Sequence, residues 1–328
     1  MLNFVQAYYD LISSKSEFTR SYPSIYFQFS ATATLHYSTT PSLKGPHHFF
    51  LNIRSDRHKL GPMDDDQFRQ LLDWFNFAWT GYRKVRKGVK KRISRHMQEL
   101  NCPNIKVYLN LLNSSDAARQ EAERRMTVSI SRFFRDRQLW HDLAEDILPP
   151  MIETQKKIFQ VWSAGCARGE EVYSFKIVWD RLIGKYDQQP DLELTATDMH
   201  PDYIEKAVAG VYNKSSLKEV PREIRERYFD MRKSADRFEV KAFLKEGIDW
   251  KVQDIFADPS GSAFDIIFLR NNLLTYYGGH KKKEGLNKVI KVLAPDGWLI
   301  VGSHEKLPPG ALNIQRHNSI PWAYRLEA

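Results

Sequence analysis

The segment over residues 158–174 constrains the fold of this chain more than any other segment does. It reads IFQVWSAGCARGEEVYS, an apolar run of strand length, then a turn with two glycines, then a stretch typical of a helix. Gly165 and Gly169 permit backbone angles and close approaches that a side chain forbids. Such a strand, turn and helix are typical of the first unit of an open α/β sheet, where ligands bind at the carboxyl ends of the strands.

Two carboxylates, Glu170 and Glu171, head the expected helix. The N-terminus of a helix attracts anions, so these acids would repel a pyrophosphate group. A cofactor with cationic character and no phosphate is a better match, and S-adenosyl-L-methionine is the common one. The alternative interpretation is that the two acids only offset the helix dipole.

Composition predicts a soluble globular protein in the cytoplasm. Of the 328 residues, 42% are hydrophobic and 27% are charged, which is ordinary for globular domains. We find no apolar run long enough to cross a bilayer, and the first residues lack the pattern of a signal peptide. Cys102 and Cys166 stand in unrelated contexts without metal-ligand spacing, so we expect reduced thiols and no metal.

A net charge of +9 indicates an acidic partner, which by charge alone is nucleic acid, an anionic membrane or an acidic protein. Much of this charge is concentrated between Arg83 and Arg95, with no acid before Glu99. The segment lacks the interleaved aromatic residues that stack on bases, which argues against nucleic acid. A solvated helix face is the other interpretation. The basic residues are Arg83, Lys84, Arg86, Lys87, Lys90, Lys91, Arg92 and Arg95.

The chain divides by pattern into three parts. Residues 27–37 alternate between apolar and polar, which predicts a half-buried strand in a β-rich N-terminal extension over residues 1–60. Residues 61–126 are expected to form a small helical domain, whose basic helix has an apolar stripe of Val85, Val89, Ile93 and Met97. Its last part, residues 114–125, is polar and is expected to be a linker.

Residues 127–328 alternate between strand and helix patterns. Strands are expected at residues 158–162, 192–197, 248–252, 264–269 and 298–302, and helices at residues 170–182, 201–210, 221–229 and 281–293. Alternation of this kind predicts a doubly wound, mostly parallel Rossmann-like sheet with helices on both faces.

Five local motifs occur along the chain in the same order as in one known family. They are SISRFFRD at residues 129–136, the turn at residues 165–174, ATD at residues 196–198, FDIIFLRN at residues 264–271 and LAPDGWL at residues 293–299. Together they resemble the CheR family, the S-adenosylmethionine-dependent methyltransferases that esterify glutamates of chemotaxis receptors. The resemblance covers about residues 65–328 and includes the basic helix, which in the family faces an acidic receptor helix.

The resemblance implies a role for each matching residue on the methionine side of the cofactor. Arg135 would lie near the methionine end, although a surface position after an aromatic pair is the alternative. Ser129 and Ser131 stand where the family usually has Asn and Thr. Gly165 and Glu170 would meet the cofactor through the turn.

Further matching residues are implied on the adenosine side and on the floor of the site. Asp198 would bond the ribose hydroxyls, as acids at the end of a second strand commonly do. Capping of the next helix is the alternative role for Asp198. Asp254 and Ile255 stand where the family has an Asn-Leu pair near the adenosine. Arg270 and Asn271 would form the floor of the active site.

The chain departs from the family near the reacting methyl group. The family pattern after Arg-Asn ends in Ile-Tyr-Phe, whereas residues 272–277 here read NLLTYY. Without a gap, Thr275 takes the place of the tyrosine beside the methyl group, and Tyr276 takes the place of the phenylalanine. A one-residue bulge would restore Tyr276 to the site. The catalytic candidates are therefore Arg135, Thr275 and Tyr276.

These patterns favour methyl transfer to a protein glutamate, with S-adenosylhomocysteine as product. A carboxylate is already ionised near neutral pH, so the enzyme must mainly align it with the methyl group and exclude water. Alternatives are a small-molecule acceptor or another protein site, a catalytically silent module that binds the cofactor, and an RNA-associated methyltransferase.

Overall fold

The computed structural model describes residues 63–154, 156–187, 189–232, 236–257, 263–310 and 313–327. The expected β-rich extension over residues 1–60, with its strand at residues 27–37, lies outside the described residues. Within the described residues, no helix has the length and apolar character that a membrane crossing requires.

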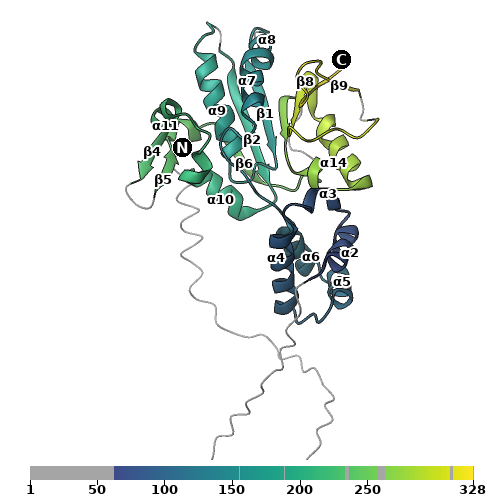
Figure 1. Cartoon of the computed structure of the whole chain (residues 1–328). Coiled ribbons are helices and arrows are strands. Elements are labelled where there is room, and N and C mark those ends of the chain that lie inside the picture. The colour runs from purple at the N-terminus through teal and green to yellow at the C-terminus, as the bar shows by residue number, and fades with distance from the viewer. Residues whose placement is uncertain are drawn as a thin grey trace, which may run out of the picture. The chain divides into compact units, whose positions relative to one another are not determined.

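A seven-stranded sheet forms the centre of the α/β part, in the order β6-β2-β1-β7-β8-β10-β9 (Figure 1). The first five strands are parallel, and β10 runs antiparallel to both β8 and β9. This architecture confirms the predicted doubly wound, mostly parallel sheet. The strands are β1 (Ile158–Ala164), β2 (Asp191–Asp198), β6 (Ile248–Val252), β7 (Phe264–Leu269), β8 (Leu293–Val301), β9 (Ile314–Arg316) and β10 (Ala323–Leu326).

Side chains alternate between two cores on opposite faces of this sheet. On β1, Phe159 and Val161 belong to one core, whereas Trp162 and Ala164 belong to the other. Successive side chains of a strand point to opposite faces, so a strand that is apolar throughout must be covered on both. Helix α9 (Glu170–Ile183) covers the first face, and helix α14 (Gly279–Lys291) covers the second.

The expected strands and helices of the α/β part are present, with ends shifted by a few residues. Strand β8 starts at Leu293, earlier than expected, and its pairing with β7 is irregular around Asp296, whose φ is +62°. The remaining helices are α7 (Arg137–Asp142), the π-helix η2 (Leu143–Ile147), α8 (Leu148–Ile152), α10 (Pro201–Ala209), the 3-10 helix η3 (Lys214–Leu217), α11 (Arg222–Tyr228), α12 (Ala242–Lys245) and α13 (Leu273–Tyr276).

A second, antiparallel sheet lies between α10 and β6 in the chain and was not predicted. Its strands pair in the order β3-β5-β4, and each is three or four residues long. Strands this short carry too few alternating positions for a period to be recognised. Their bounds are β3 (Val211–Asn213), β4 (Phe229–Arg232) and β5 (Arg237–Val240).

The helical part has a core of its own, built from the faces of five helices. On the basic helix α4, Val89, Ile93 and Met97 are buried and Val85 is half-buried, which confirms the predicted apolar stripe. The helices are α2 (Asp65–Phe75), α3 (Trp79–Tyr82), α4 (Arg86–Glu99), α5 (Ile105–Ser114) and α6 (Asp116–Met126).

The prediction of a linker over residues 114–125 was wrong, because helix α6 occupies most of that segment. Ser115 caps the helix by accepting a hydrogen bond from the Ala118 amide, at 3.2 Å. Ala118, Ala122 and Met126 recur every four residues and are buried. Two alanines make a weak apolar stripe, so the helical period could not be recognised in this mostly polar segment.

The helical part and the α/β part join through backbone contacts beside α13. Phe77 and Tyr277 form an isolated antiparallel bridge, and the Ala78 amide donates to the Tyr276 carbonyl at 2.7 Å. A Cβ atom on Gly81 would lie 2.3 Å from the Thr275 carbonyl oxygen, so only glycine permits this approach of α3 to α13. The predicted domain boundaries at residues 60 and 126 stay a prediction.

Candidate functional site

A cavity of about 1000 Å³ opens at the carboxyl ends of the parallel strands. Its wall receives Gly165 from the end of β1, Asp198 from β2, Asp254 from beyond β6 and Arg270 from beyond β7. This is the edge at which open α/β sheets bind their ligands. The volume lies at the upper end of the range for small-molecule sites.

The turn after β1 is held against the end of β2. Gly165 has a φ of +79°, and a Cβ atom there would lie 2.2 Å from the Asn272 side-chain nitrogen. The amides of Gly165 and Cys166 both donate to the Thr197 carbonyl at 2.8 Å. The glycine is therefore required by its conformation and by the close approach of Asn272.

Asp198 is a buried carboxylate that closes the same turn. Its oxygens accept hydrogen bonds from the amides of Ala167 at 2.9 Å and His200 at 3.0 Å, and the side chain also lines the cavity. Burial raises the pKa of Asp198 to about 6, while the two backbone donors lower it. The cap of α10 is His200. Asp198 therefore keeps lone pairs for a hydroxyl donor in the cavity.

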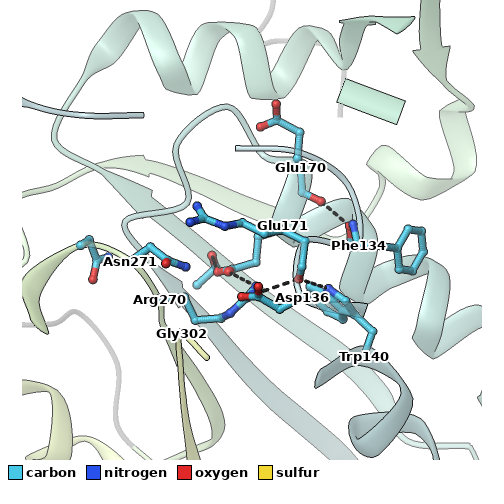
Figure 2. Close-up of polar contacts among 12 residues, drawn as sticks. Phe134, Asp136, Trp140, Glu170, Glu171, Arg270, Asn271 and Gly302 are labelled. Carbon is cyan, nitrogen blue, oxygen red and sulfur yellow. Dashed lines mark hydrogen bonds and ion pairs between the residues drawn. The ribbon is translucent and has the colours of Figure 1, made fainter. Parts of the chain in front are cut away.

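The two glutamates after Gly169 have separate environments (Figure 2). Glu171 lines the cavity and accepts hydrogen bonds from Ser163 and Arg270, each at 2.9 Å. Glu170 is 1% exposed and is not part of the cavity wall. Figure 2 shows its carboxylate pointing away from Glu171 and Arg270. The sequence-based choice of Glu170 therefore missed Glu171, because neighbouring residues on a helix point in different directions.

Glu170 nevertheless retains an unused acceptor. Burial raises its pKa, while the backbone amide of Glu170 and the neighbouring Ser131 side chain, which lines the cavity, lower it. The Ser216 hydroxyl lies 3.5 Å from its Oε1 atom, whereas its buried Oε2 atom has no partner among the described residues. A buried polar atom without a partner is costly to the fold.

Arg270 ties the loop before α7 to the sheet (Figure 2). Its guanidinium group bonds Glu171 through Nη1 and Asp136 through Nη2, both at 2.9 Å, and it also donates to the Arg135 carbonyl at 3.0 Å. The Trp140 ring lies beneath, with its centroid 5.5 Å away, and its indole donates to the same carbonyl at 2.9 Å. Arg270 thereby fixes this loop through paired, largely buried charges.

The side chain of Arg135 lies on the cavity side of that loop. It lines the cavity together with Ser129 and Ser131, and its Nη1 atom donates to the Ile130 carbonyl at 2.7 Å. Asp136, which follows it, has a φ of +63°. Strained backbone of this kind persists where the surroundings hold it in place, here through Arg270.

Glu305 holds the turn between β7 and α13, and sequence reasoning gave it no role. Its carboxylate is 8% exposed and accepts hydrogen bonds from the amides of Asn271 at 2.7 Å and Gly302 at 2.8 Å. The Thr275 hydroxyl donates to it at 2.5 Å. Thr275 lines the cavity, but its hydroxyl is already engaged in this cluster.

Tyr276 also lines the cavity, and its neighbour Tyr277 packs as a core aromatic residue. The Tyr276 ring meets Tyr82 edge to face at 5.1 Å between centroids. Burial raises the pKa of Tyr276, and the nearby charge of Arg135 lowers it. The turn before α13 is irregular, with φ of +56° at Asn271 and φ/ψ of −130°/−96° at Asn272. The one-residue bulge stays a prediction.

The cavity thus brings together every residue selected from the sequence except Glu170. Glu171 lines it as well, although only Glu170 of the pair was selected from the sequence, and Asn272, Glu305 and Glu123 also line it without having been selected. The selected residues in its wall are Ser129, Ser131, Arg135, Gly165, Asp198, Asp254, Ile255, Arg270, Asn271, Thr275 and Tyr276.

The residues present fit S-adenosyl-L-methionine. The cavity presents the Asp198 carboxylate as an acceptor for ribose hydroxyls, and the Glu171 carboxylate lines the same wall. Acids and cations both line the wall, with Asp198 and Asp254 at the ends of β2 and β6 and Arg135 and Arg270 on the side of β7. The fold and this cavity define a methyltransferase that uses S-adenosyl-L-methionine.

Comparison with known families identifies the kind of methyltransferase. The family described as CheR methyltransferase, SAM binding domain, matches residues 129–323, which is more than half of the chain. The chain therefore belongs to the CheR methyltransferase family, and its cofactor is S-adenosyl-L-methionine.

Relatives in several bacteria are similar over different shares of their length. A chemotaxis protein methyltransferase of Listeria monocytogenes is 29% identical over 184 residues, covering 56% of this chain and 67% of that protein. One from Borreliella burgdorferi is 25% identical over 252 residues, covering 74% and 88%. An uncharacterized 104.1 kDa protein of Rhodobacter capsulatus is 27% identical over 221 residues, and the match spans 67% of this chain but only 23% of that protein.

Proposed function

We propose that this protein transfers the methyl group of S-adenosyl-L-methionine to a glutamate carboxylate of an acidic protein partner. The observation that carries this proposal is the extent of the cavity. Its wall runs from the cofactor-side residues Asp198 and Arg270 to Arg83, Lys84 and Arg86 at the start of the basic helix. An anionic acceptor entering between these cations would meet the cofactor at the far end.

The exposed face of α4 supports an acidic partner. Arg86 and Lys90 are paired with Asp65. Five other basic side chains of this region are exposed and form no ion pair within the described part of the chain. A row of unneutralised cations attracts an acidic surface and steers its approach. The exposed residues are Arg83, Lys84, Lys87, Lys91 and Arg95.

The relatives make a chemotaxis receptor the natural candidate for this partner. The Listeria and Borreliella proteins are named chemotaxis protein methyltransferases. A receptor segment with several acids along one helix would match the basic face of α4. We also propose a cytoplasmic location, consistent with Cys102 and Cys166 being free and buried.

The cofactor supplies a methyl group made electrophilic by a sulfonium centre. The residues of this chain need only hold the acceptor carboxylate in line with that methyl group and keep water out. Arg135 would offset the charge of the acceptor, and the Tyr276 ring would form the wall beside the reacting atoms. Thr275 would act indirectly, because its hydroxyl bonds Glu305.

A carboxylate acceptor agrees with the engagement of two cavity acids, Glu305 and Glu171, in hydrogen bonds. An amine or hydroxyl acceptor must lose a proton, which calls for a base close to the reacting atom. Glu305 already accepts three hydrogen bonds, and Glu171 accepts two. A glutamate side chain needs no such assistance, since it is ionised near neutral pH.

The experiment is incubation of the full chain with methyl-labelled cofactor and a cytoplasmic receptor domain that bears acidic helices. We expect label on the receptor that mild base releases as methanol, since methyl esters are base-labile. Label that resists base would contradict the carboxylate acceptor. Binding of cofactor without transfer to any receptor domain would contradict the proposal as a whole.

Two neighbouring variants separate the roles of the α13 residues. Tyr276→Phe should keep the wall but lose the hydroxyl, so a modest fall in turnover is expected, whereas Tyr276→Ala should lower turnover at least tenfold. Thr275→Val removes the bond to Glu305 and should act mainly through disorder of the turn. A larger loss in Thr275→Val than in Tyr276→Ala would place Thr275 nearer the methyl group.

A further inference from the structure

Helix α6 of the helical part contributes a carboxylate to the cofactor cavity. Glu123 lines the same wall as Asp254 and Ile255, although it lies far from both in the chain. The Tyr277 hydroxyl lies 3.4 Å from its Oε1 atom, which is a long hydrogen bond. The sequence gave no reason to place a residue of this segment beside the cofactor.

The surroundings of Glu123 leave it short of hydrogen-bond donors. Burial raises its pKa, the charge of Lys281 lowers it, and the neighbouring charge of Asp254 raises it again. Within the part of the chain that the structure describes, the long bond from Tyr277 is the single hydrogen bond to this side chain. A half-buried carboxylate with one weak donor has spare capacity for a donor on a ligand.

The position of Glu123 along the sheet indicates which part of the cofactor it meets. Asp198 at the end of β2 is suited to the ribose hydroxyls, and Arg135 and Arg270 lie on the side of β7. Strand β6 is on the far side of β2 from β7, so Asp254 and Ile255 lie beyond the ribose position. The base of the nucleoside belongs there, and Glu123 stands beside Asp254 at that end.

Adenine presents one donor group at its edge, the 6-amino group with two N–H bonds. We propose that Glu123 accepts a hydrogen bond from this amino group and thereby selects adenine over a 6-oxo purine. Asp254 is placed to accept the second, since its Oδ1 atom is bonded to the Phe256 amide and its Oδ2 atom remains. This inference rests on the cofactor and not on the identity of the methyl acceptor.

The test compares the affinity of the full chain for S-adenosylhomocysteine and S-inosylhomocysteine, whose purine carries a carbonyl oxygen at position 6. The carbonyl replaces both N–H donors of the amino group and leaves N1–H as the one donor at this edge, so the carbonyl oxygen faces carboxylate oxygens without a proton between them, and sites built for a donor reject such analogues strongly. We expect at least 100-fold weaker binding of the inosyl compound by calorimetry. Equal affinities would overturn the proposal.

Glu123→Gln is the decisive variant, because its amide can donate to the carbonyl at nearly unchanged size. The preference for the adenosyl compound should fall to less than tenfold, with the inosyl compound gaining affinity. If both affinities fall by the same factor, Glu123 only supports the structure and the proposal is wrong. Asp116→Asn is the matched control, a carboxylate on the same helix that is 79% exposed and should change neither affinity.

Two further measurements keep the result interpretable. Tyr277→Phe removes the existing donor to Glu123 and should leave the adenosyl preference intact. If Glu123→Gln fails to fold, the unmodified chain still provides a test with N6,N6-dimethyl S-adenosylhomocysteine, which lacks both N–H donors. We expect that compound to bind at least 100-fold more weakly, and an unchanged affinity would contradict the proposed contact.

Discussion

The two ends of the cavity are built in different ways. The donor end is the part of the cavity where Asp198, Glu171 and Arg270 would meet the methyl donor. Its charged groups form buried ion pairs: Arg270 pairs with Glu171 and Asp136, at side-chain exposures of 3%, 14% and 24%. At the acceptor end, Arg83 and Lys84 are exposed and Tyr276 is half-buried. The helical part contributes to that end and meets α13 through backbone contacts and through the packing of Tyr276 and Tyr277 against its core.

This contrast indicates how one fold can keep its cofactor while its acceptor changes. The donor end depends on the packing of the sheet, so a substitution there disturbs stability and cofactor affinity together. The acceptor end depends on surface charge and on the approach of α3 to α13. Substitutions there should change the acceptor kinetics and leave the cofactor affinity unchanged.

The strongest challenge to this contrast is Arg270→Ala. The change leaves the carboxylates of Glu171 and Asp136 without their shared cation, and breaking such a buried pair costs about 3–5 kcal/mol. We expect a loss of that order in the free energy of unfolding by urea denaturation and at least 100-fold weaker cofactor binding. Arg270→Lys keeps the positive charge but loses the two-pronged guanidinium group that bonds both carboxylates. We therefore expect losses of stability and of cofactor affinity between those of the unmodified chain and of the alanine variant. Unchanged cofactor affinity in the alanine variant would contradict the role given to the donor end.

Asp198→Asn should have the next largest effect and should also alter the pH dependence. Burial raises the Asp198 pKa from 3.8 to about 6, so between these values the folded protein holds a proton that the unfolded chain has lost. The free energy of unfolding should therefore fall as pH rises through this window, by up to about 3 kcal/mol.

Cofactor affinity should show the opposite trend in the same window. Ribose hydroxyls donate to the ionised carboxylate, so affinity should rise as pH increases through about 6. Asp198→Asn should weaken binding about tenfold or more and flatten this rise. Glu170 and Glu123 also have raised pKa values, so any rise left in the variant would report on them. A variant with the full pH dependence would show that Asp198 does not contact the cofactor.

Gly81→Ala tests the acceptor end without touching the cofactor residues. Its Cβ atom would lie 2.3 Å from the Thr275 carbonyl oxygen, so α3 and α13 must move apart. We expect about a tenfold loss of turnover with a protein acceptor and less than a twofold change in cofactor affinity. Gly184→Ala is the control, because no atom lies within 4 Å of its added Cβ. A parallel loss of cofactor affinity in Gly81→Ala would show that the two ends are not independent.

The smallest effect is expected from the double variant Lys87→Glu, Lys91→Glu on the exposed face of α4. The KM for an acidic acceptor should rise about fivefold at low salt, and the difference should shrink at high salt because exposed charges are screened. Lys106→Glu, an exposed lysine on α5, is the matched control. An unchanged KM at low salt would leave α4 as a solvated face, the other interpretation of its charge.

Local pattern was sufficient for much of the fold. The apolar run at residues 158–162 and the glycines that follow it predicted β1, its turn and α9, because both sides of a parallel strand are buried and leave a continuous signal. The antiparallel strands near residues 211–240 and helix α6 escaped prediction. The strands show only short alternations of apolar and polar residues, and the buried stripe of α6 consists mainly of alanines. Both elements become stable through tertiary packing, which a local pattern does not show.

The candidate site shows the same division. Asp198 was predicted from its place at the end of a strand, where backbone topology alone brings it to the cavity. Glu305 was not selected, and Glu171 was noted only as one of two acids without a site role, because the roles of both come from partners far away in the chain. Arg270 bonds Glu171, and Asn271 and Thr275 bond Glu305. No local spacing encodes such contacts.

The sequence by itself determined the sheet, the crevice after β1 and, through the ordered motifs, the family and its methyl donor. These depend on hydrophobic period and on glycines with special backbone angles, which are local properties. Only the tertiary structure decided that Glu171 rather than Glu170 faces the cavity, that Thr275 is engaged by Glu305, and that Glu123 reaches the wall from another helix. Those outcomes depend on which side chains meet across the fold, and that is set by packing between distant segments.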